Sequence, residues 1–158
     1  MSHDQTAQER LASLERKISR LEDIEAIRSL LVTYANANDA DDWDRFASIF
    51  ADDAHLVIAA PFNVDVRSPE AVVTANRGFG DVFRKRRHNI FNVGIDPEQG
   101  SGGANFMATF IEIQKNQSMI CEGNYRFKFA RADGHWRISE QIIDIVYLSP
   151  ASWKLENV

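Results

Sequence analysis

The chain has 158 residues, of which 44% are hydrophobic and 26% are charged, and this length and composition favour one globular domain with a sizeable core. The formal net charge of −5 argues against nucleic acid or an anionic membrane as the partner of the whole chain. Cys121 is the only cysteine, so an internal disulfide is excluded, a thiolate metal site is not expected, and no apolar run is long enough to cross a bilayer.

The N-terminal region lacks the hydrophobic segment of a signal peptide, so we expect a cytoplasmic protein. Residues 1–10 are predicted to form a flexible tail, and residues 11–158 a single domain. An apolar stripe at steps of three and four begins at Leu11 and predicts a helix that runs to about Asn38. The first half of this helix could pack on a second subunit or on the chain's own sheet.

The second half of the predicted helix carries an apolar stripe that ends in polar residues. Its members are Leu21, Ile24, Ile27, Leu31, Tyr34 and Asn38. A buried phenol and a buried amide need hydrogen-bond partners, so the stripe is predicted to end against a polar pocket. Asp39 follows at the helix C-terminus, where the helix dipole disfavours a carboxylate, so another group should hold it there. Tyr34 could equally be an ordinary core tyrosine, and Asp39 a turn residue.

A short second helix is predicted over residues 42–50. Asp41 is expected to cap it, with Asp44 as the partner in a short capping box. Trp43 and Phe46 are favoured as core anchors over ligand contacts.

Short strands are predicted next, after a turn at Asp52-Asp53. Residues 55–60 form an apolar strand closed by a proline, and residues 62–66 could form a second one. Ser68-Pro69-Glu70 then starts a helix that is expected to run to about Arg87, unless its glycines break it.

A run of four basic residues, Arg84–Arg87, is expected to close that helix. Cations are favourable at a helix C-terminus, because they complement the helix dipole. The alternative is a basic mouth that attracts an anionic substrate.

From residue 88 onward the helical spacing of apolar residues gives way to the every-second-residue alternation that is typical of long strands. Over residues 88–95 one face carries Phe91, Val93 and Ile95, and the other carries His88, Ile90 and Asn92. Residues 104–114 and 119–130 are predicted to pair as a hairpin.

The last predicted strand follows a second hairpin turn. Asp133-Gly134 is a strong turn signal before a strand over residues 136–148, and Trp153 could anchor the C-terminal tail. Helices followed by long antiparallel strands predict an α+β fold. A sheet with apolar side chains on both faces needs cover on both, so we expect the helices on one face and a second subunit of a homo-oligomer on the other.

Three residues are predicted to converge at the open end of the helix-covered face. His88 would point inward from its strand, and Tyr34 and Asp39 come from the helix that covers it. A carboxylate fixes one imidazole nitrogen and leaves the other free to take a proton from carbon, while a phenol can donate to an oxygen that gains negative charge. This set suits proton abstraction next to a carbonyl, followed by elimination or isomerisation.

The chain resembles the nuclear transport factor 2-like superfamily, in its SnoaL-like and scytalone dehydratase-like branch. The resemblance is carried by Asp23-Ile-Glu-Ala-Ile-Arg28, Tyr34-x4-Asp39-x2-Asp42-Trp43, Phe50-Ala-Asp-Asp-Ala54, Arg87-His88-x3-Asn92, Gly123-x-Tyr125 and Asp133-Gly-His-Trp136-Arg. It implies helices packed on a strongly curved, mostly antiparallel sheet, which forms a cone-shaped half-barrel with an internal pocket (the cystatin-like fold).

The helix-end motif is most similar to that of bile acid 7α-dehydratase, which implies that Tyr34, Asp39 and His88 are catalytic. The residues expected to contact the substrate are Asn38, Trp43, Asn92, Phe106 and Tyr125. Scytalone dehydratase places its tyrosine directly before the Asp, where this chain has Asn38. It also uses a second strand histidine, which residues 104–114 lack.

The resemblance implies a cofactor-independent dehydratase or isomerase, without a metal, that acts on an apolar cyclic small molecule. A dehydrochlorinase branch keeps the Asp–His pair too, so water is not the only possible leaving group. The alternative is a non-catalytic small-molecule binding module, or a protein like the structural β subunit of a ring-hydroxylating dioxygenase.

Overall fold

The structure, a computed structural model, describes residues 3–150, with side chains described from residue 6 onward. Trp153 lies outside the described residues, and the division into a tail at 1–10 and a domain at 11–158 stays a prediction. The elements run in the order α1 (His3–Asp39), α2 (Trp43–Ala47), β1 (Phe50–Ile58), β2 (Val64–Arg67), α3 (Pro69–Gly80), β3 (Phe83–Asp96), β4 (Ser101–Glu112), β5 (Gln117–Ala132) and β6 (His135–Pro150).

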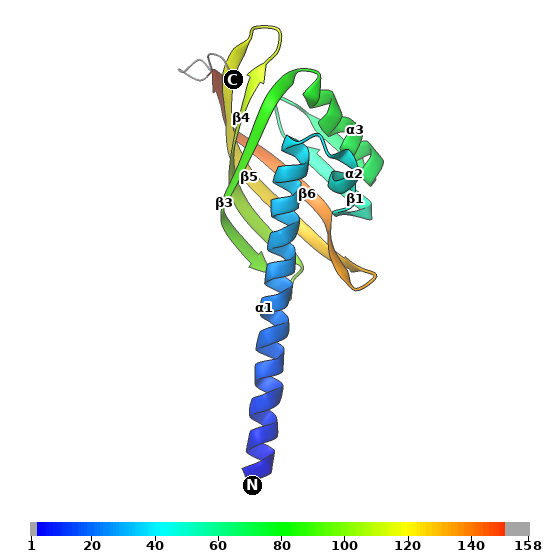
Figure 1. Cartoon of the computed structure of the whole chain (residues 1–158), viewed down its shortest axis with the longest axis vertical. Helices are drawn as coiled ribbons and strands as arrows, with labels where there is room; N and C mark the ends of the chain where they lie inside the picture. Colours follow the sequence, from blue (N-terminus) through cyan, green and yellow to red (C-terminus); the bar gives the residue numbers. More distant parts are fainter. Residues whose placement is uncertain (1–2, 151–158) are drawn as a thin grey trace.

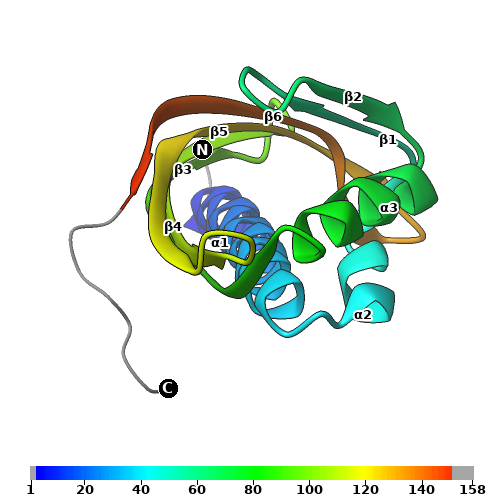
Figure 2. The same cartoon turned by 90° about the horizontal axis from the view of Figure 1, so that it is seen from above.

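The strands form one curved sheet in the order β2-β1-β6-β5-β4-β3. β1 lies parallel to β6, and the other neighbouring pairs are antiparallel. Figure 2 shows the sheet wrapped around α1, with α2 and α3 beside the open side, so the sheet does not close into a barrel. The predicted α+β half-barrel is therefore confirmed. No helix within residues 3–150 is both long and apolar enough to span a membrane.

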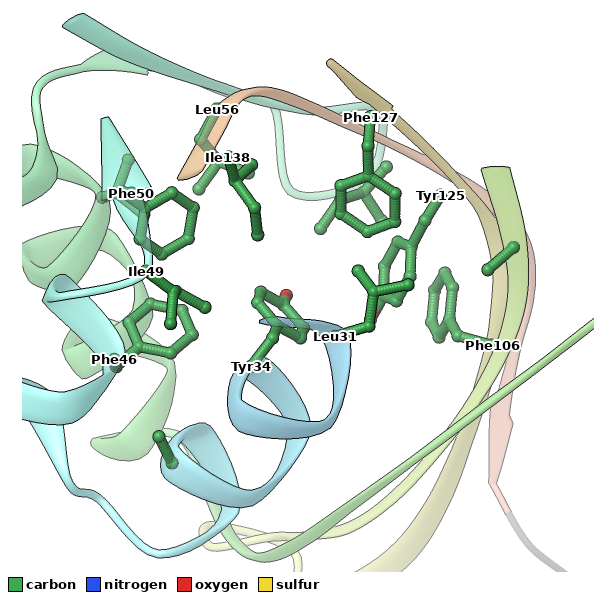
Figure 3. Close-up of a cluster of buried hydrophobic side chains, with 14 of the residues drawn as sticks. Leu31, Tyr34, Phe46, Ile49, Phe50, Leu56, Phe106, Tyr125, Phe127 and Ile138 are labelled. Carbon is green, nitrogen blue, oxygen red and sulfur yellow. The ribbon is translucent and has the colours of Figure 1, made fainter. Parts of the chain in front are cut away.

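The core between α1 and the sheet is rich in aromatic rings (Figure 3). The ring centroid of Tyr34 lies 5.3 Å from that of Phe46 and 5.7 Å from that of Tyr125. Burying one large aromatic or aliphatic side chain contributes roughly 1.5–3 kcal/mol, so these contacts hold the last turns of α1 firmly between α2 and β5. The residues at the end of α1 are thereby fixed relative to the sheet.

The second half of α1 follows the predicted stripe, with one exception. Ile27, Leu31 and Tyr34 are buried, and the helix ends at Asp39. Leu21 is 65% exposed, so its assignment to the core-facing stripe was wrong. Six residues turn an α-helix by about 600°, which places Leu21 and Ile27 on different sides. The helix also begins at His3, before the expected start near Leu11.

The cap of α2 is Asp42, so the expectation of a cap at Asp41 was wrong. The Asp42 side chain accepts a hydrogen bond from the Arg45 N–H at 3.2 Å. Asp41 adopts a left-handed backbone conformation (φ 56°) and forms an ion pair with Arg86 instead.

Two further local expectations were wrong. Asp52 and Asp53 lie in β1 and not in a turn, because the register against β6 shifts after Phe50 and leaves two successive side chains exposed.

Helix α3 begins at the predicted Ser68 cap but ends at Gly80, since glycines disfavour the helix interior. The basic run Arg84–Arg87 therefore opens β3 and does not close α3.

The turn between β5 and β6 has the predicted form. Asp133 and Gly134 have φ values of 50° and 79°, as a two-residue hairpin turn of type I′ requires, and Ala132 pairs with His135 across it.

Candidate active site

Asp39 and His88 meet where the C-terminal end of α1 crosses β3. The Nδ1 atom of the His88 ring lies 2.6 Å from Oδ1 of Asp39, and the His88 backbone N–H donates to Oδ2 of Asp39 at 3.0 Å. Both side chains are largely buried, with exposed fractions of 14% for His88 and 10% for Asp39. The backbone of β3 therefore supplies the group that was expected to hold a carboxylate at a helix C-terminus.

This contact controls which ring nitrogen of His88 is free. A carboxylate can only accept a hydrogen bond, so the nitrogen that faces Asp39 must carry the proton of the neutral ring. The proton is therefore on Nδ1, and the lone pair is on Nε2. His88 also lines a cavity under the concave face of the sheet. A neutral imidazole with a free Nε2 at a cavity wall can act as a general base, and the adjacent carboxylate stabilises the imidazolium that results.

The cavity has about 590 Å³ of space free of protein atoms, a volume that includes space open to solvent. Most of its wall is apolar, and its polar groups gather at the end where α1, α3 and β3 meet. The lining residues are Tyr34, Asn38, Ile58, Phe62, Asn76, Phe79, Phe83, Arg86, His88, Phe106, Ala108, Phe110, Cys121, Tyr125, Ile143 and Ile145. An apolar cavity with a few polar groups at one end suits a small hydrophobic ligand with one polar function.

Tyr34 lies beside His88 on the cavity wall, with its ring edge-on at 6.2 Å between centroids. Burial raises the pKa of the Tyr34 hydroxyl, and the nearby side chains of Gln141 and Tyr125 offset part of this increase. Figure 3 shows Tyr34 rising from α1 toward the strand that carries Tyr125. The hydroxyl therefore stays protonated near neutral pH and can serve as a hydrogen-bond donor.

Phe106 and Tyr125 form the wall of the cavity opposite α1. Their rings stack at 4.3 Å between centroids with an interplanar angle of 9°. Burial raises the pKa of Tyr125 well above its ordinary value, and the neighbouring Tyr34 adds to the increase. Both residues line the cavity, and Tyr125 presents a neutral phenol there, while their contact with a substrate stays a prediction.

Arg86 and two asparagines build a polar wall next to His88. Asn38 donates to the Asn76 side chain at 3.0 Å, and Asn76 donates to the Val72 carbonyl at 2.8 Å. Arg86 donates to the Asn38 carbonyl at 2.9 Å and pairs with Asp41. These bonds tie α1 to α3 and β3 around the cavity mouth.

Arg86 carries a buried polar atom that is left without a partner, and Gln141 is a second buried polar side chain near the site. The side chain of Arg86 is only 8% exposed, and no acceptor for its Nε exists among residues 3–150. Gln141 is 1% exposed and lies beside the Tyr34 hydroxyl, whose pKa it lowers through a side-chain hydrogen bond. A buried guanidinium N–H without an acceptor at a cavity wall is suited to bind an oxygen of a ligand.

Sequence reasoning missed Asn76 and Gln141, and it considered Arg86 only as part of the basic run Arg84–Arg87, with a basic mouth as the alternative to a helix end. The signal for Arg86 was its spacing, because residues two apart in a strand share a face, and His88 is two residues on. The assumption that residues 84–87 close a helix hid this relationship. Gln141 similarly occupies an inward position of a strand that was predicted correctly.

Asn92 does not reach the cavity, although it was expected to share a face with His88. It has a φ of 53°, is exposed, and donates to the Asn105 side chain at 2.9 Å. The register between β3 and β4 shifts between Phe91 and Gly94, which interrupts the alternation. Ile90 and Val93 consequently both pack against the core, so the predicted division of β3 into two faces was wrong.

Trp43 also stands outside the cavity, where it packs on the core side against Phe46 at 5.9 Å between ring centroids. The guanidinium groups of Arg77 and Arg86 each lie 5.7 Å from the centre of its ring. Trp43 thus supports Arg86 from behind, which agrees with the anchor interpretation of this residue more than with a ligand contact.

No group of three or more His, Cys, Asp or Glu side chains within residues 6–150 is arranged to hold a metal ion. The acidic and imidazole groups of the site occur as the single pair of Asp39 and His88.

Comparisons with solved structures show which known proteins share this fold. Hexachlorocyclohexane dehydrochlorinase LinA-type3 from Novosphingobium barchaimii LL02 is 22% identical over 90% of this chain and 99% of its own, with a TM-score of 0.80. A candidate scytalone dehydratase from Novosphingobium aromaticivorans DSM 12444 is 17% identical over 90% and 99% of the two chains, with a TM-score of 0.76. An NTF2-like protein with a cystatin-like fold from Novosphingobium aromaticivorans is 15% identical over 86% and 90%, with a TM-score of 0.65.

No curated protein matches the sequence. A family model does match, and it is the model of the SnoaL-like domain, over residues 19–141. This span contains the second half of α1, the Asp39–His88 pair, and all of the cavity-lining residues except Ile143 and Ile145. The chain therefore belongs to the SnoaL-like domain family.

Proposed function

We propose that this chain is a cofactor-independent lyase or isomerase that removes a proton next to a carbonyl group of an apolar cyclic small molecule. The observation that carries the proposal is the contact between Asp39 and His88 at the wall of an apolar cavity. The pair is nearly buried and both carboxylate oxygens are engaged, so the histidine is held in one orientation.

The proposed reaction begins with the free Nε2 of His88. It takes a proton from the carbon next to the carbonyl, and the electron pair of that C–H bond moves toward the carbonyl oxygen. Asp39 stabilises the imidazolium, and the Tyr34 hydroxyl donates to the oxygen that gains charge. Removing one such donor costs roughly 3–4 kcal/mol of transition-state stabilisation in other enzymes.

Two outcomes follow from the same intermediate. In a dehydration the electron pair forms a carbon–carbon double bond, the neighbouring C–O bond breaks, and the leaving oxygen takes the proton from His88 to become water. In an isomerisation His88 returns the proton to a different carbon. Both outcomes leave the enzyme in its starting protonation state, and neither requires a redox step.

The proposed substrate is mostly apolar, with its carbonyl at the polar end of the cavity. Apolar rings such as Phe62, Phe79 and Phe110 line much of the wall. Arg86 supports this orientation, because it lines the cavity together with His88 and its buried Nε has no acceptor among the described residues.

The proposal is tested by proton exchange, which needs no knowledge of the leaving group. A panel of cyclic ketones, hydroxy-ketones and enones is incubated with the protein in D₂O, and deuterium uptake is followed by mass spectrometry. We expect uptake with the wild type and a loss on the order of 10²–10⁴-fold in His88→Ala. His135→Ala is the matched control, because His135 is an exposed histidine beside a hairpin turn.

A non-catalytic binding module is the rival function. Ligand binding without any exchange, or exchange that is equal in the wild type and in His88→Ala, would favour that rival over the enzyme.

A further inference from the structure

The first half of α1 carries an apolar stripe that the described chain does not cover. Leu11, Leu14, Ile18 and Leu21 are 58%, 55%, 55% and 65% exposed. Figure 1 shows this half of α1 extending beyond the sheet as a free rod. Four large apolar side chains in one row on an exposed helix are typical of a contact surface.

This stripe faces away from the chain's own domain. An α-helix turns by about 100° per residue, which puts Ile18 on roughly the opposite side of α1 from Ile27 and Tyr34, the residues that pack into the core. A straight α1 therefore cannot bring the stripe to its own sheet. A partner that covers the stripe approaches from the side that the domain leaves open.

We propose that a second copy of this chain covers the stripe, and that the two α1 helices form a parallel two-stranded coiled coil over residues 10–22. The steps of three, four and three residues are those of the a and d positions of a heptad repeat, with Leu11 and Ile18 at a, and Leu14 and Leu21 at d. Ile at an a position with Leu at the d positions favours two strands.

The charges beside the stripe specify the parallel orientation. Arg10 and Lys17 occupy g positions, and Glu15 and Glu22 occupy e positions. In a parallel pair each g residue faces the e residue five positions later in the other helix. Arg10 then faces Glu15 of the partner subunit, and Lys17 faces Glu22 of the partner subunit, so both contacts join opposite charges.

The antiparallel orientation fails on the same residues. There g positions face g positions and e positions face e positions, so Lys17 would oppose a lysine and Glu15 would oppose a glutamate. Like charges at these positions disfavour pairing. The charge pattern therefore selects the arrangement in which both domains lie at the same end of the coiled coil.

The sequence also predicts where the coiled coil ends. Glu25 and Arg28 occupy the next a and d positions, and within the chain they pair with each other at 3.9 Å. Charged side chains at both positions interrupt an apolar contact, so the helices separate after Leu21. α1 meets its own domain from Arg20 onward, through the ion pair of Arg20 with Glu98 at 3.4 Å and the hydrogen bond from Trp136 to Asp23 at 3.0 Å.

The test is disulfide cross-linking at the predicted contact. Leu14→Cys and, separately, Ile18→Cys are oxidised under mild conditions, with Ser19→Cys as the control, because Ser19 is an exposed residue at a b position. The native Cys121 is buried and is present in all three variants. We expect disulfide dimers of the Leu14→Cys and Ile18→Cys proteins to form at least tenfold faster than those of Ser19→Cys. A cross-linking rate no higher than that of the control would overturn the proposal.

Mixing the two cysteine variants tests the orientation. In the parallel form, peptide mass spectrometry should find 14–14 and 18–18 disulfides, whereas 14–18 disulfides would show the antiparallel form and contradict the proposal. Sedimentation adds an independent readout of strand number. The wild type should sediment as a dimer that Leu14→Glu dissociates, with the circular dichroism of the sheet retained. A monomeric or trimeric wild type would overturn the two-stranded form.

The charge pattern is tested by reversal. The double variants Glu15→Lys/Glu22→Lys and Arg10→Glu/Lys17→Glu should each dimerise more weakly than the wild type, and a mixture of the two should form a heterodimer. Failure of the mixture to associate would contradict the parallel pairing.

Discussion

Asp39 accepts two hydrogen bonds from His88, one from ring Nδ1 at 2.6 Å and one from the backbone N–H at 3.0 Å. The bond from the backbone N–H orients the Asp39 side chain. Because a backbone N–H can only donate, it always takes one oxygen of the side chain at residue 39. The other oxygen is left for the ring, and this fixes where the ring carries its proton.

Asp39→Asn is predicted to lower kcat on the order of 10²–10⁴-fold, although the amide has nearly the same shape as the carboxylate that it replaces. The amide oxygen must turn to the backbone N–H of His88, so the amide NH₂ faces Nδ1. Nδ1 then has to accept, and the proton moves to Nε2, which can no longer act as a base. The measurement is the deuterium exchange rate beside that of Asp53→Asn, an exposed carboxylate in β1. Equal rates in the wild type and Asp39→Asn would remove the carboxylate from the mechanism.

Tyr34→Phe is predicted to reduce turnover by about 10²-fold or more while the free energy of unfolding changes by only about 1 kcal/mol. The ring keeps its contacts with Phe46 and Tyr125, so packing is preserved, and only the hydroxyl donor is lost. Turnover and urea unfolding measured on the same preparation separate the two effects. A variant with full activity would assign Tyr34 to the core alone.

Stability is predicted to fall as the pH rises above about 9. Burial raises the pKa of Cys121 to about 11, and it also raises the pKa of Tyr34 and of Tyr125. The native state therefore keeps protons that the unfolded chain releases first, so the unfolded state binds fewer protons and the free energy of unfolding decreases with pH. The contribution is complete below the unfolded-state pKa values and is lost through the alkaline range.

The measurement for this prediction is urea unfolding between pH 8 and pH 11 in the wild type and in Tyr125→Phe. The variant should lose stability less steeply, because it lacks one buried phenol. Parallel curves for the two proteins would contradict the assignment of the alkaline loss to Tyr125.

Arg86→Met is predicted to destabilise the fold by roughly 1–3 kcal/mol, since it removes the 2.9 Å hydrogen bond to the Asn38 carbonyl and the ion pair with Asp41. It should also weaken binding of ketones more than binding of hydrocarbons of the same shape, because only the ketone can use the free Nε. Urea unfolding and ligand titration measure the two effects. Arg84→Met is the control at an exposed site, where a change within about 0.5 kcal/mol is expected.

Much of the fold was predictable because its signals are local. The Asp133-Gly134 turn and the apolar stripe through Ile27 and Leu31 each fix an element by short-range geometry. The pairing of Asp39 with His88 was predictable for a related reason. A carboxylate at an unfavourable helix end and an inward histidine each need a partner, and the expected topology brings the two elements together.

The errors arose where irregularities of the backbone interrupt the two-residue alternation of side chains along a strand. At Asn92 a register shift turns a residue of the expected inner face outward, and at Asp52 another shift exposes two neighbouring side chains. Neither shift has a marker in the sequence that distinguishes it from regular alternation. The position of Arg86 beside His88 was not recognised because the end of α3 was predicted too late. A helix that continues past Gly80 points the Arg86 side chain in a different direction from a strand.

The most direct test of the Asp39–His88 pair is the position of the ring proton. In protein labelled with ¹⁵N-histidine, the His88 signals are assigned by their absence in His88→Ala and recorded at a pH where the ring is neutral. The structure predicts a proton on Nδ1 and a bare Nε2 in the wild type, and the opposite tautomer in Asp39→Asn. The same tautomer mixture in both proteins would contradict the account, because the carboxylate would then not determine which nitrogen of His88 is the base.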